Sequence, residues 1–397
     1  MMKKYHILAK NNLSTGIKIN REEQPHLFPP GEKATAALWV NNEEGSIILP
    51  LRLDIKKLYV EVTTLCNFAC TTCIRNSWQD DMGQMAWDTF ERLLEQMKFL
   101  PELECVHFGG FGEPMSHPRI FDMLYAVKNL GLRVEMITNG SLLTQENIQR
   151  LISLPLDRIY ISLDGPDKEE YNEIRQGAEF TSVVDNIRAL NLAKEKAKTK
   201  LPELGIEFVA MKKNFHKLSK LIRLSRELMA RQVIVTNVLP YNEEMKDQIL
   251  YDMDDTMIDY GKDSIWVNIL AQMPNMKLRT ERLCKFAEDK AAAITYRGEV
   301  APCYALMHAY HCYIYGRRKE IFPFYLGNVN EATLADIWTD PAYVNFRSKL
   351  KNFDFPSCTD CKFLDGCSYT DDNEADCWGN SPSCADCLWS RRLIACP

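Results

Sequence analysis

Long hydrophobic runs are missing from this sequence of 397 residues. A membrane-spanning helix needs about 20 mostly apolar residues in succession, and every apolar run here is far shorter. The segment 1–12 contains basic side chains, but no apolar stretch follows it, so we expect no secretion signal. The sequence therefore predicts a cytoplasmic protein with no membrane partner.

Clustered positive charge is also missing. The formal net charge is −6, and the basic run at 194–200 has the character of a solvated helix face. Binding to nucleic-acid phosphates requires a concentrated positive excess, so nucleic acid is not an expected partner. Hydrophobic residues make up 46% of the chain and charged residues 26%. This balance is that of a globular protein, and the length suggests two or three domains.

Cysteine, by contrast, is plentiful, with 14 residues. In a protein without a secretion signal, disulfides are not expected, and cysteines usually serve metal binding or catalysis. The spacing of the cysteines decides between these uses.

The secondary-structure pattern divides the chain into four parts. Residues 1–54 form a small β unit, with strands at 35–41 and 46–53 around a turn-like segment, and Pro50 indicates an edge strand. Residues 55–245 alternate strands with amphipathic helices, which predicts an α/β fold with a parallel sheet. Residues 246–283 are a polar connection. Residues 284–397 are rich in cysteine and form a second domain organised by metal.

Six strand-helix units are too few for the eight of a complete TIM barrel, so we expect a partial (β/α)6 barrel with its active site at the carboxyl ends of the strands. The predicted strands are 58–63, 105–108, 133–138, 158–163, 204–209 and 232–237.

The first cysteine cluster follows the first barrel strand. Cys66, Cys70 and Cys73 have the spacing C-x3-C-x2-C. Three thiolates on one loop can hold three irons of a [4Fe-4S] cube and leave the fourth iron open. The alternative is a zinc site, but structural zinc takes four ligands and no fourth is near in sequence. The spacing and position resemble the radical SAM superfamily, whose open iron binds S-adenosylmethionine (SAM).

That resemblance implies a SAM pocket built from the ends of the following strands. Its glycine-rich motif corresponds to Gly109, Gly110 and Glu113, in which glycines allow close backbone approach and the carboxylate accepts from an ammonium. The remaining matching positions are Thr138, Asn139, Ser162, Asp164 and Arg175, with Asn237 as an additional candidate. Arginine suits a carboxylate because it forms two parallel hydrogen bonds. Thr72 stands where the superfamily often has an aromatic residue or methionine near adenine.

The later cysteines resemble the SPASM domain, the auxiliary-cluster extension of many peptide- and protein-modifying radical SAM enzymes. The resemblance implies two auxiliary [4Fe-4S] clusters, with Cys284 and Cys303 at the nearer one. The farther cluster takes Cys358, Cys361 and Cys367. The family has another cysteine where this chain has Asp371, so Cys377 is the expected replacement. Nine cysteines compete for eight places, since the set also contains Cys384, Cys387 and Cys396. A pair of zinc ribbons is the alternative.

Two cysteines stand outside these motifs. Cys105 begins a core strand and is read as an inert buried thiol. Cys312 lies in an aromatic insertion, residues 304–325, together with His308 and His311. The insertion is either a surface loop packed by its own tyrosines or a lid that contacts substrate.

The segment DCWGNSPSCADCLW at 376–389, with CIRNSW at 73–78, resembles the radical SAM maturases associated with tungsten-cofactor oxidoreductases of the aldehyde ferredoxin oxidoreductase type. This implies a protein substrate, a tungstopterin oxidoreductase, and a low-potential electron donor such as ferredoxin or flavodoxin. The alternatives are a radical SAM enzyme that modifies a ribosomal peptide or a sulfatase, and a non-catalytic metal-binding module.

Overall fold

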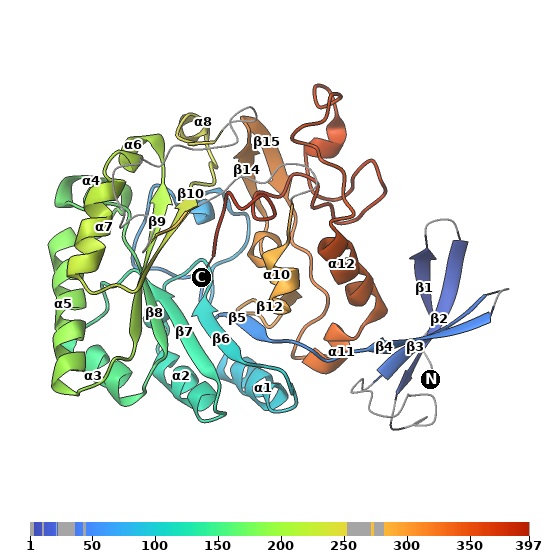
Figure 1. Ribbon diagram of the computed structural model, residues 1–397, viewed down its shortest axis with the longest axis horizontal. Helices are drawn as coiled ribbons and strands as arrows, with labels where there is room; N and C mark the ends of the chain where they lie inside the picture. The colour runs from blue at the N-terminus through green and yellow to red at the C-terminus, as the bar shows by residue number, and fades with distance from the viewer. Residues whose placement is uncertain are drawn as a thin grey trace.

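A computed structural model describes residues 4–9, 12–20, 22, 36–42, 45–251, 271–273 and 282–396. Its centre is a nine-stranded sheet in the order β11-β10-β9-β8-β7-β6-β5-β12-β13. Every neighbouring pair is parallel except β12 and β13. Figure 1 shows the sheet curving around an open interior with helices on its outer face. The predicted partial barrel is confirmed.

The six predicted barrel strands are all present. They are β5 (Lys57–Glu61), β6 (Cys105–Gly109), β7 (Arg133–Thr138), β8 (Arg158–Ser162), β9 (Glu203–Ala210) and β10 (Gln232–Asn237). The helices around them are α1 (Trp87–Met97), α2 (Ile120–Lys128), α3 (Gln145–Ser153), α4 (Lys168–Ile174), α5 (Phe180–Lys196), α6 (Lys212–Phe215), α7 (Leu218–Glu227) and α8 (Glu243–Lys246). Short 3-10 turns lie at Ile74–Ser77 and Pro114–Ser116.

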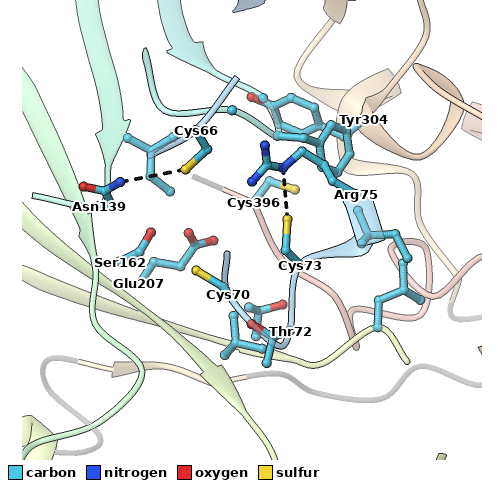
Figure 2. A pocket seen from close by; sticks show the side chains of 18 of the residues that line it. Cys66, Cys70, Thr72, Cys73, Arg75, Asn139, Ser162, Glu207, Tyr304 and Cys396 are labelled. Carbon is cyan, nitrogen blue, oxygen red and sulfur yellow. Dashed lines mark hydrogen bonds between the residues drawn. The ribbon is translucent and has the colours of Figure 1, made fainter. Parts of the chain in front are cut away.

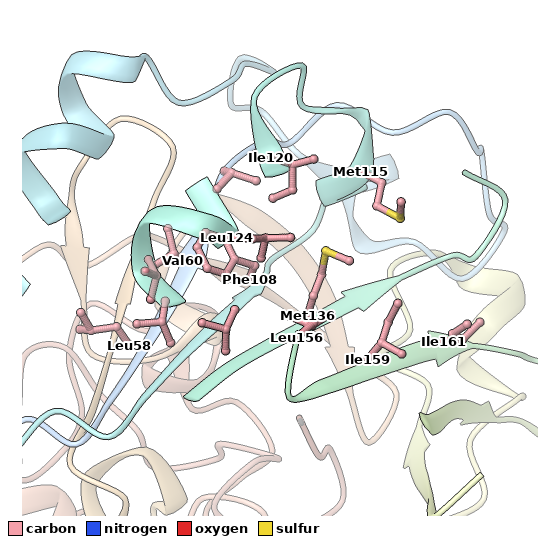
Figure 3. Packing of buried hydrophobic residues seen from close by; sticks show 14 of the residues in the cluster. Leu58, Val60, Phe108, Met115, Ile120, Leu124, Met136, Leu156, Ile159 and Ile161 are labelled. Atoms are coloured by element: carbon pink, nitrogen blue, oxygen red, sulfur yellow. The ribbon is translucent and has the colours of Figure 1, made fainter. Parts of the chain in front are cut away.

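The main core lies between the sheet and these helices (Figure 3). Leu58, Val60 and Phe108 on the strands meet Leu124 of α2, and all four are buried. Each such side chain contributes roughly 1.5–3 kcal/mol through burial. The strands read as apolar runs because both of their faces are covered, as is usual for parallel sheets. Local sequence agrees with the fold, since the Thr144 hydroxyl accepts from Asn147 N at 3.2 Å and caps α3.

The N-terminal unit is a four-stranded antiparallel sheet in the order β1-β2-β3-β4. Its strands are β1 (Lys4–Ala9), β2 (Asn12–Asn20), β3 (Ala36–Asn42) and β4 (Gly45–Leu51). Pro50 lies on β4, which pairs only with β3 in the part of the chain that the structure describes. The predicted edge strand is therefore confirmed. Figure 1 shows this unit beside the C-terminal helices, away from the open end of the barrel.

The cysteine-rich part does not begin with a separate sheet. Its β12 (Ala291–Ile294) pairs in parallel with β5, and β13 (Val300–Ala301) pairs with β12. The barrel sheet thus continues across the boundary predicted at 284. The sequence did not indicate this extra strand, because β12 is only four residues long. The division of the chain at 54, 245 and 283 stays a prediction. Most of the predicted connection 246–283 lies outside the described residues.

The other elements of this part are short. They are β11 (Ala271–Gln272), α10 (Lys285–Glu288), β14 (Tyr310–Ile314), β15 (Arg317–Ile321), α11 (Leu334–Trp338), α12 (Pro341–Asn352) and 3-10 turns at Tyr304–Leu306 and Ser368–Thr370. Among the described residues, no helix combines the length and the apolar character that crossing a bilayer requires.

Candidate active site

A cavity of about 290 Å³ lies at the carboxyl ends of the barrel strands. Figure 2 shows side chains from several strand ends and from the C-terminal part around it. Most predicted site residues line this one cavity: Cys66, Cys70, Thr72, Cys73, Gly110, Glu113, Thr138, Asn139, Ser162, Arg175 and Asn237. Gly109 and Asp164 do not line it, although Asp164 forms an ion pair with Arg175, which does.

The cysteine loop is held by backbone hydrogen bonds to the segment that follows α4. Ala69 N donates to Gln176 O at 2.9 Å, and Thr71 N donates to Ile174 O at 2.8 Å. Burial raises the pKa of the Cys70 thiol to about 11. A bound metal reverses this preference because coordination removes the thiol proton.

Arg75 lies beside this loop. Its Nε donates to the Cys73 sulfur at 3.1 Å, and its Nη1 donates to Thr64 O at 2.8 Å. A cation here stabilises negative charge on the cysteine sulfurs. Sequence reasoning quoted Arg75 within a motif but gave it no role, since a single arginine after a cysteine motif carries no separate signal.

The glycine-rich turn packs directly onto the cysteine loop. A Cβ at Gly112 would lie 2.2 Å from the Thr63 carbonyl oxygen, which excludes any other residue there. Gly110 has a φ of +112°, and a Cβ on it would meet the Glu61 side chain at 2.6 Å. These glycines let two strand ends approach one another closely enough to enclose a small ligand.

Glu113 joins the ends of β6 and β7. Its Oε1 accepts from the Thr138 hydroxyl at 2.7 Å and from Met115 N at 2.9 Å, and its Oε2 accepts from Asn139 N at 2.7 Å. Burial raises the pKa of Glu113, although these hydrogen bonds oppose the shift. A carboxylate offers about four acceptor positions, so one stays available for an ammonium group.

Asp164 positions Arg175. The carboxylate is fully buried, pairs with Arg175 Nη2 at 2.9 Å and accepts from Val209 N at 2.9 Å. Burial disfavours the charged guanidinium, but Asp164 outweighs that effect and the pKa of Arg175 lies above its ordinary value. Arg175 Nε is buried and has no hydrogen-bond partner among the described residues. It is a donor suited to a ligand carboxylate.

Glu207 is a cavity residue that sequence reasoning missed. It lies opposite Ser162 in the pairing of β8 with β9. Burial and the nearby Asp164 raise its pKa to about 7, and Arg175 partly offsets the rise. A carboxyl with this pKa can hold or release a proton at neutral pH. The available signal was a charged residue inside an otherwise apolar strand.

The aromatic insertion packs against the barrel. It contains the hairpin β14–β15, and Tyr310 forms a β-bridge with Trp78. His308 Nε2 lies 2.7 Å from Glu61 Oε2, and His308 Nδ1 lies 3.0 Å from Asp80 Oδ2. Burial lowers the pKa of His308, but the two carboxylates raise it by a larger amount, so the net shift is upward.

Tyr304 and Tyr310 of the same insertion line the cavity. This placement favours the predicted lid over a free surface loop. Cys312 is buried on β14, and Cys105 is buried at the start of β6. The pKa of the Cys105 thiol is raised to about 11 by burial, in keeping with an inert thiol.

Comparison with known proteins identifies the family of this chain. Residues 60–200 match the model of the radical SAM superfamily, and residues 284–362 match the SPASM iron–sulfur cluster-binding domain. The tungsten-containing aldehyde ferredoxin oxidoreductase cofactor-modifying protein of Pyrococcus furiosus is 41% identical over 347 residues, which cover 86% of this chain and 97% of that protein. The chain belongs to the radical SAM superfamily. It is a SAM-dependent modifying enzyme with a SPASM domain.

Other relatives of this radical SAM enzyme are more distant. The PqqA peptide cyclase of Gluconobacter oxydans is 25% identical over 303 residues, covering 73% of this chain and 78% of that protein. Among solved structures, Streptococcus suis SuiB bound to the precursor peptide SuiA has a TM-score of 0.55 at 18% identity, over 79% of this chain and 71% of that chain. The structural likeness shows the shared fold.

The family implies a SAM-binding [4Fe-4S] cluster, auxiliary clusters and SAM. The cavity suits the SAM-binding cluster and SAM. It presents three thiols on one side and an unpartnered Arg175 donor on the other.

The C-terminal cysteines fall into two sets of four in space. The inner set contains Cys284, Cys303, Cys384 and Cys387. Burial raises the pKa of Cys303, and the neighbouring Cys284 and Cys387 raise it further. The same neighbours act on Cys384. Three of these cysteines line a second, smaller cavity.

The outer set contains Cys358, Cys361, Cys367 and Cys377. Burial raises the pKa of Cys377, and Cys367 and Cys361 lie near enough to raise it further. Cys361 and Cys377 are exposed, whereas the inner thiols are half-buried. The structure thus brings Cys377 near Cys361 and Cys367, and its assignment as a cluster ligand stays a prediction.

Cys396 lies beside the inner set but differs from it in what it lines. It packs against the same cluster as Cys284 and Cys303, and Cys387 adds to the rise that burial causes in the pKa of Cys396. Unlike the four inner cysteines, Cys396 lines the SAM cavity together with Cys66, Cys70 and Cys73. No spacing rule could have shown this, because the placement depends on where the segment 389–396 meets the barrel.

Proposed function

We propose that this enzyme cleaves SAM reductively and uses the resulting radical to modify the cofactor of a tungsten-dependent oxidoreductase. When bound at Cys66, Cys70 and Cys73, the [4Fe-4S] cluster supplies the electron that breaks SAM into methionine and a 5′-deoxyadenosyl radical. The observation that carries the proposal is the single cavity that combines these thiols with the predicted SAM-binding side chains.

In this proposal each side chain has a defined role in holding SAM. Arg175, held by Asp164, binds the methionine carboxylate, and the free acceptor position of Glu113 binds the ammonium. The ribose hydroxyls meet Thr138, Asn139 and Ser162, and adenine lies near Thr72 and the backbone at Gly109 and Gly110. Asn237 supports the opposite wall, since its Nδ2 donates to Leu393 O at 2.9 Å.

We further propose that the inner and outer cysteine sets hold one auxiliary [4Fe-4S] cluster each. Four thiols per set complete the ligation of a cube. The partly exposed outer set faces an electron donor of the ferredoxin or flavodoxin type, and the inner set lies nearer the SAM cavity. Reducing conditions in the cytoplasm would keep all these thiols available.

Assignment of a tungsten enzyme as the target is supported by the Pyrococcus furiosus relative, which covers nearly the full length. Peptide modification is the second candidate, because the PqqA peptide cyclase also matches most of the chain. The insertion with Tyr304 and Tyr310 provides an aromatic wall for either kind of substrate.

The chemistry can be tested without the substrate. Protein reconstituted with iron and sulfide under anoxic conditions, reduced and given SAM, should release 5′-deoxyadenosine and methionine. Zinc uptake without this activity would instead support a metal-binding module.

The target can be tested by co-expression. A tungsten-dependent aldehyde oxidoreductase would be produced together with this protein or with its Cys70→Ala variant, and its cofactor would be extracted without oxygen. A difference in mass or in chromatographic retention between the two cofactor preparations supports the proposal. Cofactors identical in both properties would contradict it and favour a peptide substrate.

A further inference from the structure

The segment 389–396 enters the barrel and forms part of the SAM cavity. Asn237 N donates to Leu393 O at 3.1 Å, and Ala395 N donates to the Thr236 hydroxyl at 2.9 Å. Both contacts are made at the end of β10, on the open side of the partial barrel. They place Cys396 in the wall opposite the SAM-binding strand ends (Figure 2).

The Cys396 thiol has an arrangement suited to giving away its hydrogen. Its sulfur accepts from Trp389 Nε1 at 3.2 Å, so the S–H bond itself is free to point elsewhere. Cys396 lines the SAM cavity and also a third cavity, the charged cavity, which is bordered by Lys57, Glu135 and Arg158. The charged cavity gives the thiol a polar route for proton exchange with solvent.

A second residue also indicates a reacting group at this place. The Tyr304 side chain is 7% exposed and lines the SAM cavity, and its hydroxyl has no hydrogen-bond partner in the described part of the chain. A buried hydroxyl without a partner costs free energy unless a ligand satisfies it. Tyr304 thus marks where a polar substrate group sits, in the same wall as Cys396.

We propose that Cys396 is a catalytic hydrogen-atom donor that quenches the substrate radical. After the adenosyl radical has removed one hydrogen atom from the substrate, the substrate radical adds to an unsaturated position of the substrate, so that a new σ bond replaces a π bond and the unpaired electron moves to the neighbouring atom. This second radical takes the hydrogen of the Cys396 thiol. The S–H bond breaks, a bond from hydrogen to substrate forms, and the unpaired electron passes to sulfur. One electron from the ferredoxin- or flavodoxin-type donor and one proton from the Glu207 carboxyl restore the thiol, and Glu207 regains its proton from solvent.

The surroundings of Cys396 support this role. Trp389 also lines the small cavity formed by Cys303, Cys384 and Cys387, so it lies between the inner cysteine set and Cys396. Its position provides a route for the returning electron. The inference rests on the proposed function, because it requires SAM cleavage.

The test uses the cluster-loaded protein in deuterated buffer without substrate. Under these conditions the Cys396 thiol carries deuterium, and the adenosyl radical takes its atom from the nearest donor. We expect the 5′-deoxyadenosine from the parent to contain deuterium. Most of that label should be lost in Cys396→Ala and in Cys396→Ser, whose O–H bond is too strong to donate. Cys105→Ala is the matched control, because Cys105 lines the charged cavity but not the SAM cavity.

Iron analysis provides a readout that does not depend on activity. Cys396→Ala should keep the iron content of the parent, whereas Cys387→Ala should lose about four iron atoms per chain. Equal labelling in Cys396→Ala and the parent would overturn the inference, as would an iron loss matching that of Cys387→Ala. A parent that forms no 5′-deoxyadenosine would overturn the proposed function as well, so the two failures can be told apart.

Discussion

The cysteine loop of the barrel and the cysteine sets of the C-terminal part use the same side chain for different ends. The loop offers three thiols, fixed by backbone bonds to the segment after α4, inside a cavity that also holds Arg175 and Glu113. The C-terminal sets offer four thiols each, drawn from distant positions and held by short turns. A set with one ligand too few leaves room for a substrate, whereas a complete set can only pass electrons or stabilise the fold.

The largest effect should follow from removing a thiol of the three-cysteine loop. In Cys70→Ala the cluster has only two protein ligands, so 5′-deoxyadenosine formation should fall by about a hundredfold or more. Anaerobic assay with chromatography of the nucleoside measures it. Cys105→Ala, which removes a buried thiol outside the cavity, should behave as the parent. Equal rates in Cys70→Ala and the parent would refute the assignment of the loop.

The next effect concerns the SAM carboxylate. Arg175→Lys keeps the charge but loses the planar pair of donors, so the KM for SAM should rise about tenfold to a hundredfold. Steady-state assays at varied SAM concentration measure the change. The exposed Arg188 pairs with Asp185 of its own helix and with no other acidic residue in the described part of the chain, which makes Arg188→Lys the matched control. An unchanged KM in Arg175→Lys would remove this residue from the SAM site.

A smaller effect on SAM cleavage is expected from the outer set. Cys361→Ala should lower the iron content by about four atoms per chain and abolish substrate modification, yet retain part of the 5′-deoxyadenosine formation. The reason is that SAM binds at the other, three-thiol site. If cleavage fell as far as in Cys70→Ala, the difference between the two kinds of site would be lost.

The smallest effect is a pH-dependent change of stability at Glu207. Its pKa is about 7 in the folded protein against an ordinary 4.5, so the folded state binds more protons than the unfolded state between these values. The contribution of the raised Glu207 pKa to the free energy of unfolding is complete below pH 4.5 and is lost as the pH rises through 7. Relative to the parent, Glu207→Gln should therefore gain about 2–4 °C in Tm between pH 5.5 and pH 8. Thermal melts of loaded protein at both pH values measure it, and a constant difference would show that Glu207 is not shifted.

The sequence alone determined the barrel and most of the SAM cavity. Apolar runs separated by helical periodicity located all six barrel strands, because both faces of a parallel sheet are buried and its strands contain few polar residues. The cysteine spacing and the glycine-rich turn were readable because their chemistry depends on neighbours along the chain. In a parallel sheet, moreover, the strand ends must meet at one edge, so Glu113, Ser162 and Arg175 were brought together as expected.

Tertiary structure alone decided how the nine later cysteines divide and which groups face the SAM cavity. Cys384 and Cys387 join Cys284 and Cys303 across about a hundred residues, and Cys396 lies beside this set while also lining the SAM cavity. The pKa of Glu207 is raised because folding buries its carboxyl and brings Asp164 near it. These relations join segments that are distant in sequence and lack a repeating pattern, so they arise only from packing.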